Sequence, residues 1–103
     1  MSEEFRVSVP ADHPALAGHF PDRPVVPGSI LLEAVMIAFA RWQSAVTAAR
    51  IVSVKFLRPV PPAAEIAIVF AALGATRVRF EGRLGRELAF AGELATEARG
   101  PAA

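Results

Sequence analysis

Two side chains within residues 18–35, GHFPDRPVVPGSILLEAV, are suited to proton transfer. His19 stands in a proline-rich segment, and Glu33 follows fourteen residues later inside the apolar run from Ile30 to Ala40. An imidazole can accept a proton at cellular pH. A carboxyl group in the first turn of a helix is subject to two opposing influences, desolvation and the helix dipole. The pair predicts general acid–base chemistry, and the alternatives are a structural loop histidine and a glutamate that points to water.

Gly28 precedes the predicted helix, so its backbone N–H could bind a developing oxyanion, and the missing side chain would let a carbonyl group approach closely. Plain turn geometry is the alternative role for this glycine. Pro21, Pro24 and Pro27 restrict the backbone and are expected to stiffen the loop that aims His19. His13 is interpreted as a solvated loop residue, because no cluster of Cys, His and acidic residues at suitable spacing predicts a metal site.

The composition limits the classes of protein to which the chain can belong. The chain has 103 residues, a length that predicts a single domain over residues 1–103. Its hydrophobic content of 53% and mean hydropathy of +0.41 predict that part of the surface is covered by another subunit, so an oligomer is expected. The net charge of +1 comes from scattered basic and acidic residues, which disfavours nucleic acid as a partner. No cysteine is present, so disulfides and thiolate chemistry are excluded. No apolar leader and no membrane-spanning run are found, so a cytoplasmic protein without membrane contact is expected.

Alternation and turn residues predict one strand, a long proline-rich loop over residues 11–28, one helix and four more strands. The helix is apolar nearly all round and is expected to be buried. Its Met36, Phe39 and Trp42 either pack in the core or line an acyl channel. The links between the later strands suit antiparallel connections, and residues 96–103 are expected to be frayed. This order predicts an α+β fold with an antiparallel sheet around a long central helix. The predicted strands are Glu4–Val9, Arg50–Arg58, Glu65–Leu73, Thr76–Arg83 and Arg86–Leu94, and the predicted helix is Ser29 to about Ser44.

This layout resembles the hotdog fold, and residues 18–34 resemble the signature segment of the β-hydroxyacyl-acyl-carrier-protein dehydratases. The shared pattern is His19-Phe20-Pro21, then Pro24, Pro27-Gly28, the aliphatic residues 30–32 and Glu33. A second, weaker similarity to the family covers residues 54–65, VKFLRPVPPAAE. Asp22 stands where many members have Gly, and Ala63-Ala64 replaces Gly-Asp.

The resemblance implies dehydration of a 3-hydroxyacyl thioester to the trans-2-enoyl thioester, in fatty-acid, polyketide or polyene synthesis. His19 would remove the C2 proton, Gly28 would bind the thioester oxygen, and Glu33 would protonate the leaving hydroxyl group. Phe20 and the three prolines would support the loop. The substrate would be carried on phosphopantetheine, with no metal or redox cofactor.

In this family the two catalytic residues come from different subunits, so the resemblance implies a homodimer or a higher oligomer. His19 of one chain would face Glu33 of the other. The carrier, an acyl carrier protein or coenzyme A, stays open, as do the length and branching of the acyl chain. Arg23 and Arg58 lie near the expected entrance, where they could meet an acidic carrier. A hotdog thioesterase and a non-catalytic module that binds acyl carriers are the alternative functions.

Overall fold

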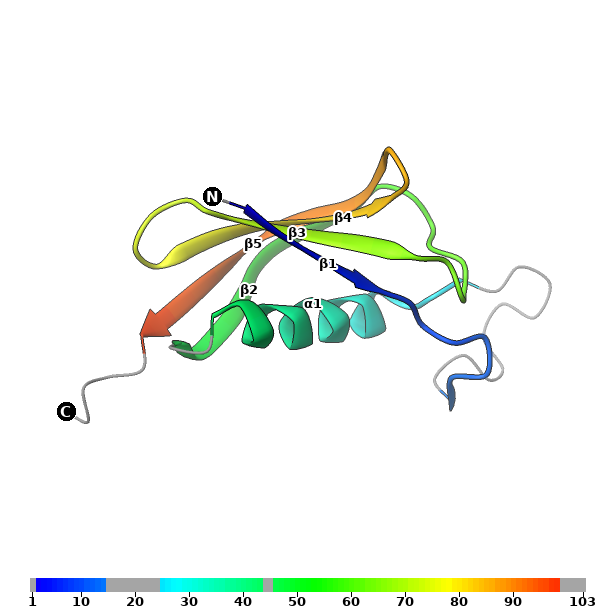
Figure 1. Ribbon diagram of the computed structural model, residues 1–103, viewed down its shortest axis with the longest axis horizontal. Helices are drawn as coiled ribbons and strands as arrows, with labels where there is room; N and C mark the ends of the chain where they lie inside the picture. The colour runs from blue at the N-terminus through cyan, green and yellow to red at the C-terminus, as the bar shows by residue number, and fades with distance from the viewer. Residues whose placement is uncertain (1, 15–24, 44–45, 99–103) are drawn as a thin grey trace.

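The computed structural model describes residues 2–14, 25–43 and 46–98. In chain order, the described residues form β1 (Ser2–Val7), α1 (Gly28–Trp42), β2 (Val46–Phe56), β3 (Ile66–Ala72), β4 (Arg77–Leu84) and β5 (Glu87–Ala98). The strands form one antiparallel sheet, and α1 lies across one of its faces (Figure 1). The predicted α+β arrangement is therefore confirmed.

The strand order in the sheet is β1-β3-β4-β5-β2, with every neighbouring pair antiparallel. Two short turns join β3 to β4 and β4 to β5, and Gly85 in the second turn has a φ of 62°, which glycine adopts without steric cost. The link from β2 to β3 joins strands that run in opposite directions, as expected, but these two strands are not neighbours, because β4 and β5 lie between them. That link therefore crosses between distant positions in the sheet.

The core lies between α1 and the inner face of the sheet. Buried and half-buried residues alternate along β3, so Ile66, Ile68 and Phe70 all face the helix. At the C-terminal half of α1, the indole of Trp42 stacks on Phe70 with ring centroids 5.3 Å apart, and Phe39 meets Phe70 edge to face at 5.6 Å. These contacts anchor α1 to the sheet, and the opposite end of the helix is where the candidate site lies.

Glycines on the inner face of the sheet make room for buried aromatic rings. A Cβ built on Gly82 would lie 2.0 Å from Cζ of Phe90, and one built on Gly92 would lie 2.5 Å from Cζ of Phe80. Both phenyl rings are fully buried. These two positions therefore admit no side chain without a rearrangement of the core.

Several predicted boundaries differ from the observed ones. β1 ends at Val7 instead of Val9, because Pro10 follows and the Val9 carbonyl instead accepts a hydrogen bond from the Ala63 N–H at 2.7 Å. The helix begins one residue earlier and ends two residues earlier than predicted. β5 continues to Ala98, so residues 96–98, which were expected to be frayed, pair with the early part of β2. The strand propensity of residues 96–98 could not reveal this pairing, because the pairing joins two segments that are distant in sequence.

The prediction that the helix is buried holds for only one side of α1 in the single chain. Only Leu31, Val35, Ala38 and Phe39 are buried, whereas Ile37 keeps 54% of its surface exposed. The physical reason is that the sheet covers one side of the helix and leaves the other side, centred on Glu33, open.

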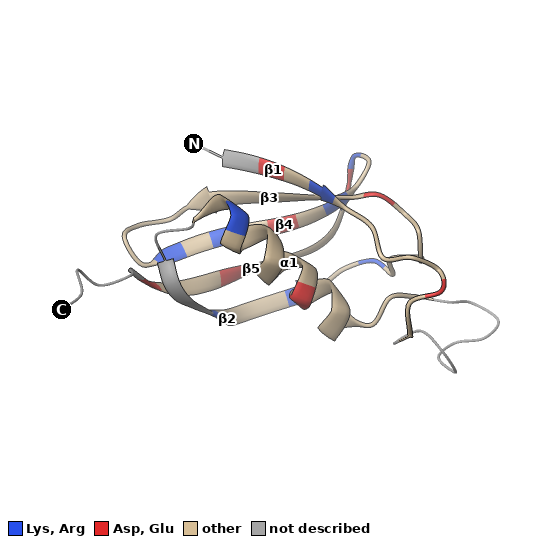
Figure 2. Ribbon diagram, turned by 60° about the horizontal axis from the view of Figure 1, so that its bottom comes forward, with Lys and Arg blue, Asp and Glu red and all other residues tan. Residues whose placement is uncertain are grey.

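The sheet carries charged residues of both signs, and Figure 2 shows both Lys or Arg and Asp or Glu positions on its strands. Glu81 pairs with Arg79 and with Arg83, each at 2.9 Å. The hydrogen bond from Arg79, followed by that from Arg83, holds the pKa of Glu81 below its ordinary value, although partial burial opposes this shift. Among the described residues, no helix is long and apolar enough to cross a membrane.

Candidate active site

The start of α1 is held in place by a proline and by a backbone hydrogen bond. Pro27 is the N-cap residue with φ −58°, and its carbonyl accepts hydrogen bonds from the Ile30 and Leu31 N–H groups at 3.0 and 3.2 Å. The preceding Val26 donates its N–H to the Val60 carbonyl at 2.8 Å, and both valines are buried. The first turn is thereby fixed against the segment that follows β2, which gives Gly28 a defined position.

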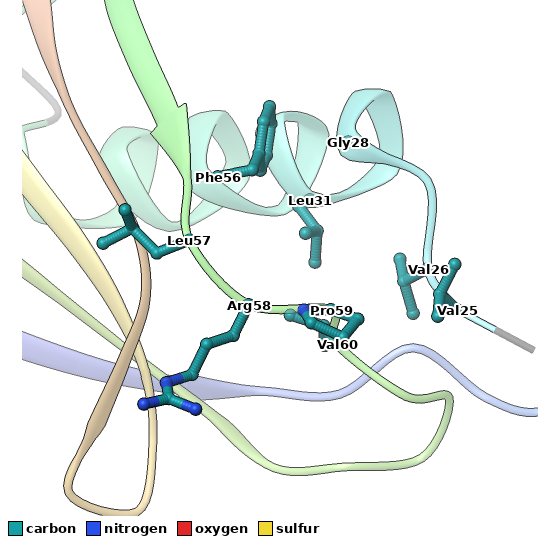
Figure 3. A pocket seen from close by; sticks show the side chains of 9 residues that line it. All are labelled: Val25, Val26, Gly28, Leu31, Phe56, Leu57, Arg58, Pro59 and Val60. Atoms are coloured by element: carbon teal, nitrogen blue, oxygen red, sulfur yellow. The ribbon is translucent and has the colours of Figure 1, made fainter.

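A pocket of about 380 Å³ opens beside this first turn. Figure 3 shows side chains from the approach to α1, from α1 itself and from the end of β2 arranged around it. Most of its lining is apolar, which suits a hydrocarbon chain better than a charged ligand. The lining residues are Val25, Val26, Gly28, Leu31, Phe56, Leu57, Arg58, Pro59 and Val60.

Phe56, the last residue of β2, packs against Gly28. A Cβ added at Gly28 would lie 2.8 Å from Cζ of this ring and 3.1 and 3.4 Å from its two Cε atoms. The ring also tilts against Phe90, with centroids 6.2 Å apart, yet Phe56 remains 46% exposed. The absence of a side chain at Gly28 therefore allows the Phe56 ring to lie close to the helix backbone. Because the ring is partly exposed, it has room to move outward.

Glu33 is the sixth residue of α1 and lies in its second turn, not in the first turn as the sequence predicted, because one turn of an α-helix takes only about 3.6 residues. Its side chain is exposed on the helix face that points away from the sheet. Within the described residues, its carboxylate makes no hydrogen bond or ion pair. An acidic side chain at this place is accessible both to a ligand and to a second chain.

Several predicted site residues lie outside the described residues: His19, Phe20, Pro21, Pro24 and Arg23. The distance between His19 and Glu33 is therefore not tested, and the predicted roles of these residues stay predictions. His13 is described and half-buried, and its N–H donates to the Pro10 carbonyl at 3.0 Å. Over residues 2–14, 25–43 and 46–98, no group of three His, Cys, Asp or Glu side chains could hold a metal ion.

Met36 and Phe39 were predicted to pack in the core or to line an acyl channel. Phe39 is 3% exposed and contacts the rings of Phe70 and Trp42, and Met36 packs at the margin of the core. Neither residue lines the 380 Å³ pocket. The core role is therefore seen directly, and the acyl-channel role stays a prediction.

Phe56, Leu57 and Val60 line the pocket although the sequence pattern did not predict them as site residues. The signal was available in the second family-like segment, residues 54–65, where apolar residues continue past the end of a strand among prolines. Arg58, which was expected near the entrance, does line the pocket, but its guanidinium points away from Val25 and Val26 (Figure 3) and pairs with Glu87 at 2.8 Å. In the same segment, Ala63 adopts a φ of 66°, a left-handed conformation that glycine adopts more easily than alanine.

Comparison with known proteins identifies one matching family. A model of the ApeI-like family, described as ApeI dehydratase, matches residues 2–92. No curated protein sequence matches the chain.

Solved structures with the same fold include an uncharacterized protein from Erwinia carotovora subsp. atroseptica, with a TM-score of 0.76 at 23% identity over 94% of this chain and 83% of that chain. The dehydratase heterocomplex ApeI:P from Xenorhabdus doucetiae has a TM-score of 0.70 at 20% identity, over 92% of this chain and 86% of that chain. The fluoroacetyl-CoA thioesterase FlK has a TM-score of 0.66 at 14% identity, over 96% of this chain and 87% of that chain. These similarities establish the hotdog fold that the sequence resemblance implied.

Proposed function

The chain belongs to the ApeI-like dehydratase family, and from this premise we propose that it converts a 3-hydroxyacyl thioester into the trans-2-enoyl thioester and water. The observation that carries the proposal is the placement of Glu33, an accessible carboxylate without a partner among the described residues, on the helix that opens with Gly28. A proton donor and a backbone N–H donor on one helix supply two of the three groups that the elimination requires.

In the proposed reaction, His19 accepts the proton from C2, and the electron pair of the broken C–H bond forms the C2–C3 double bond. The C3–O bond breaks, and the departing oxygen takes a proton from Glu33 to leave as water. Gly28 N–H binds the thioester oxygen while negative charge builds up on it, because the first N–H groups of a helix have no intrahelical acceptor. Proton exchange with solvent then restores the neutral imidazole and the protonated carboxyl group.

The acyl group enters on the phosphopantetheine arm of an acyl carrier protein or of coenzyme A. The apolar pocket beside Gly28 supports this proposal, because it offers a hydrocarbon-like wall next to the proposed oxyanion donor. The mechanism needs no metal and no redox cofactor, because the elimination of water transfers two protons and involves no net oxidation or reduction. Synthesis of fatty acids, polyketides or polyenes supplies substrates of this kind.

We also propose that the active site forms between two chains. Glu33 and Ile37 lie on the open face of α1, and β2 is an edge strand of eleven residues with Val52 and Phe56 exposed. A long, mostly apolar edge strand favours pairing with another chain. A homodimer is the simplest partner arrangement. A related dehydratase chain is the alternative, because ApeI:P is a heterocomplex.

The test is a chain-length series of 3-hydroxyacyl thioesters, each offered on acyl carrier protein and on coenzyme A. Absorbance of the enoyl thioester and release of free thiol are recorded in the same reactions. Enoyl formation without thiol release is the expected result. Thiol release without enoyl formation would replace the proposal with a thioesterase, and binding of the carrier without either product would replace it with a binding module.

A further inference from the structure

Ser29 is the second residue of α1, and its side chain is exposed. The N-cap position is occupied by Pro27, and no side-chain hydrogen bond caps the helix. Within residues 2–14, 25–43 and 46–98, the Ser29 hydroxyl has no hydrogen-bond partner. A serine near a helix start commonly bonds to the backbone, so an outward hydroxyl at this position is available to a ligand.

The geometry of an α-helix places Ser29 between the two groups that the proposed function assigns to the substrate. Successive residues are rotated by about 100°, so Glu33 lies about 140° around the helix axis from Gly28, and Ser29 lies between them. Ser29 and Glu33 are four residues apart, which brings their Cβ atoms to within about 6 Å of each other on one face. A substrate with its carbonyl group at Gly28 and its C3 hydroxyl group at Glu33 would therefore extend along the side of the helix that carries Ser29.

We propose that Ser29 is a further catalytic residue whose hydroxyl group donates a hydrogen bond to the departing C3 oxygen beside Glu33. This inference rests on the proposed dehydratase function. As the C3–O bond breaks, its electron pair moves to the oxygen, which takes its proton from Glu33 and a hydrogen bond from Ser29 Oγ. Ser29 itself neither gains nor loses a proton, so the overall reaction stays balanced. The bond strengthens as charge builds on the oxygen and therefore favours the transition state over the bound substrate.

The experiment compares the full chain with Ser29→Ala, Ser29→Thr and the control Ser8→Ala, which makes the same chemical change at an exposed serine beyond β1. Steady-state dehydration and the reverse hydration of the enoyl thioester are measured, with thermal melts to confirm folding. Ser29→Ala should lower kcat by about tenfold in both directions with little change in KM, as expected for one hydrogen bond to an oxygen that gains charge. Ser29→Thr keeps the hydroxyl group and should retain most of the turnover, and Ser8→Ala should match wild type.

The wild-type measurement separates the two proposals. If wild type forms no enoyl thioester, the dehydratase function itself is refuted. If wild type is active and Ser29→Ala keeps its kcat, the inference on Ser29 alone is refuted. The same holds if Ser29→Ala changes only KM, or if the alanine and threonine variants lose turnover equally, because the hydroxyl group would then not be the cause.

Discussion

The contact between Phe56 and Gly28 predicts that Gly28→Ala lowers catalysis without unfolding the protein. The new Cβ would lie 2.8 Å from Cζ of Phe56, closer than a normal carbon–carbon contact. The ring is 46% exposed and can move outward by the fraction of an ångström that relieves this contact. Alanine is also the better helix former, by up to about 1 kcal/mol, so the free energy of unfolding should stay within about 1 kcal/mol of wild type.

Gly82→Ala is the matched control, because the same added methyl group meets a ring that cannot move. Its Cβ would lie 2.0, 2.3 and 2.5 Å from three atoms of Phe90, which is fully buried. Overpacking of this kind costs about 3 kcal/mol, which for a domain of this size lowers the Tm by about 15 °C. Two identical substitutions should therefore differ clearly in stability.

Two measurements are combined: thermal unfolding, monitored by circular dichroism, and the rate of enoyl-thioester formation. Gly28→Ala should melt near wild type yet lose about a hundredfold in turnover, because its methyl group obstructs the approach of the thioester oxygen to the N–H donor. A Tm of Gly28→Ala as low as that of Gly82→Ala would show that Phe56 is fixed in place. Because Gly28→Ala keeps the backbone N–H and adds only a methyl group, full turnover would refute the need for a bare Cα where the thioester oxygen approaches this donor.

Three further predictions concern other parts of the chain. Ala63→Gly should raise the free energy of unfolding by about 0.5–1 kcal/mol in urea melts, because relief of the left-handed strain exceeds the added entropy of the unfolded chain; an unchanged or lower value would contradict this strain. Glu81→Gln should lower stability by less than about 1 kcal/mol at neutral pH. Because folding lowers the pKa of this carboxyl group, the deficit should shrink as the pH falls below the ordinary value of 4.5, and a deficit that persists in acid would exclude the ion pairs as its cause. His19→Ala should abolish dehydration whereas His13→Ala should not, and equal losses would indicate that loop structure is responsible.

Local sequence patterns predicted the strands and the helix well where the burial of a side chain depends on its position within its own strand. Val78 and Phe80 alternate with arginines, and both are buried on the inner face as the pattern requires. The proline and glycine before the helix likewise marked its start to within one residue. These signals depend on neighbours within a few residues, which is why sequence alone was sufficient for them.

Features that depend on distant contacts were not predictable in the same way. The ring of Phe56 reaches Gly28 only because β2 forms the sheet edge that ends beside the first turn of α1. The extension of β5 to Ala98 similarly depends on pairing with β2. The open face of α1 was missed because the apolar sequence of a helix does not reveal whether the sheet of the same chain or another chain covers each side.

Mixing two inactive variants tests the shared active site most directly. His19→Ala and Glu33→Gln are purified separately and then combined, with subunit exchange confirmed by differently tagged chains. If each site takes His19 from one chain and Glu33 from the other, half the dimers are mixed and half of their sites are intact, so dehydration should return to roughly a quarter of the wild-type rate. If both residues act within one chain, every site keeps one lesion. No recovery after confirmed exchange would therefore contradict a site formed between two chains.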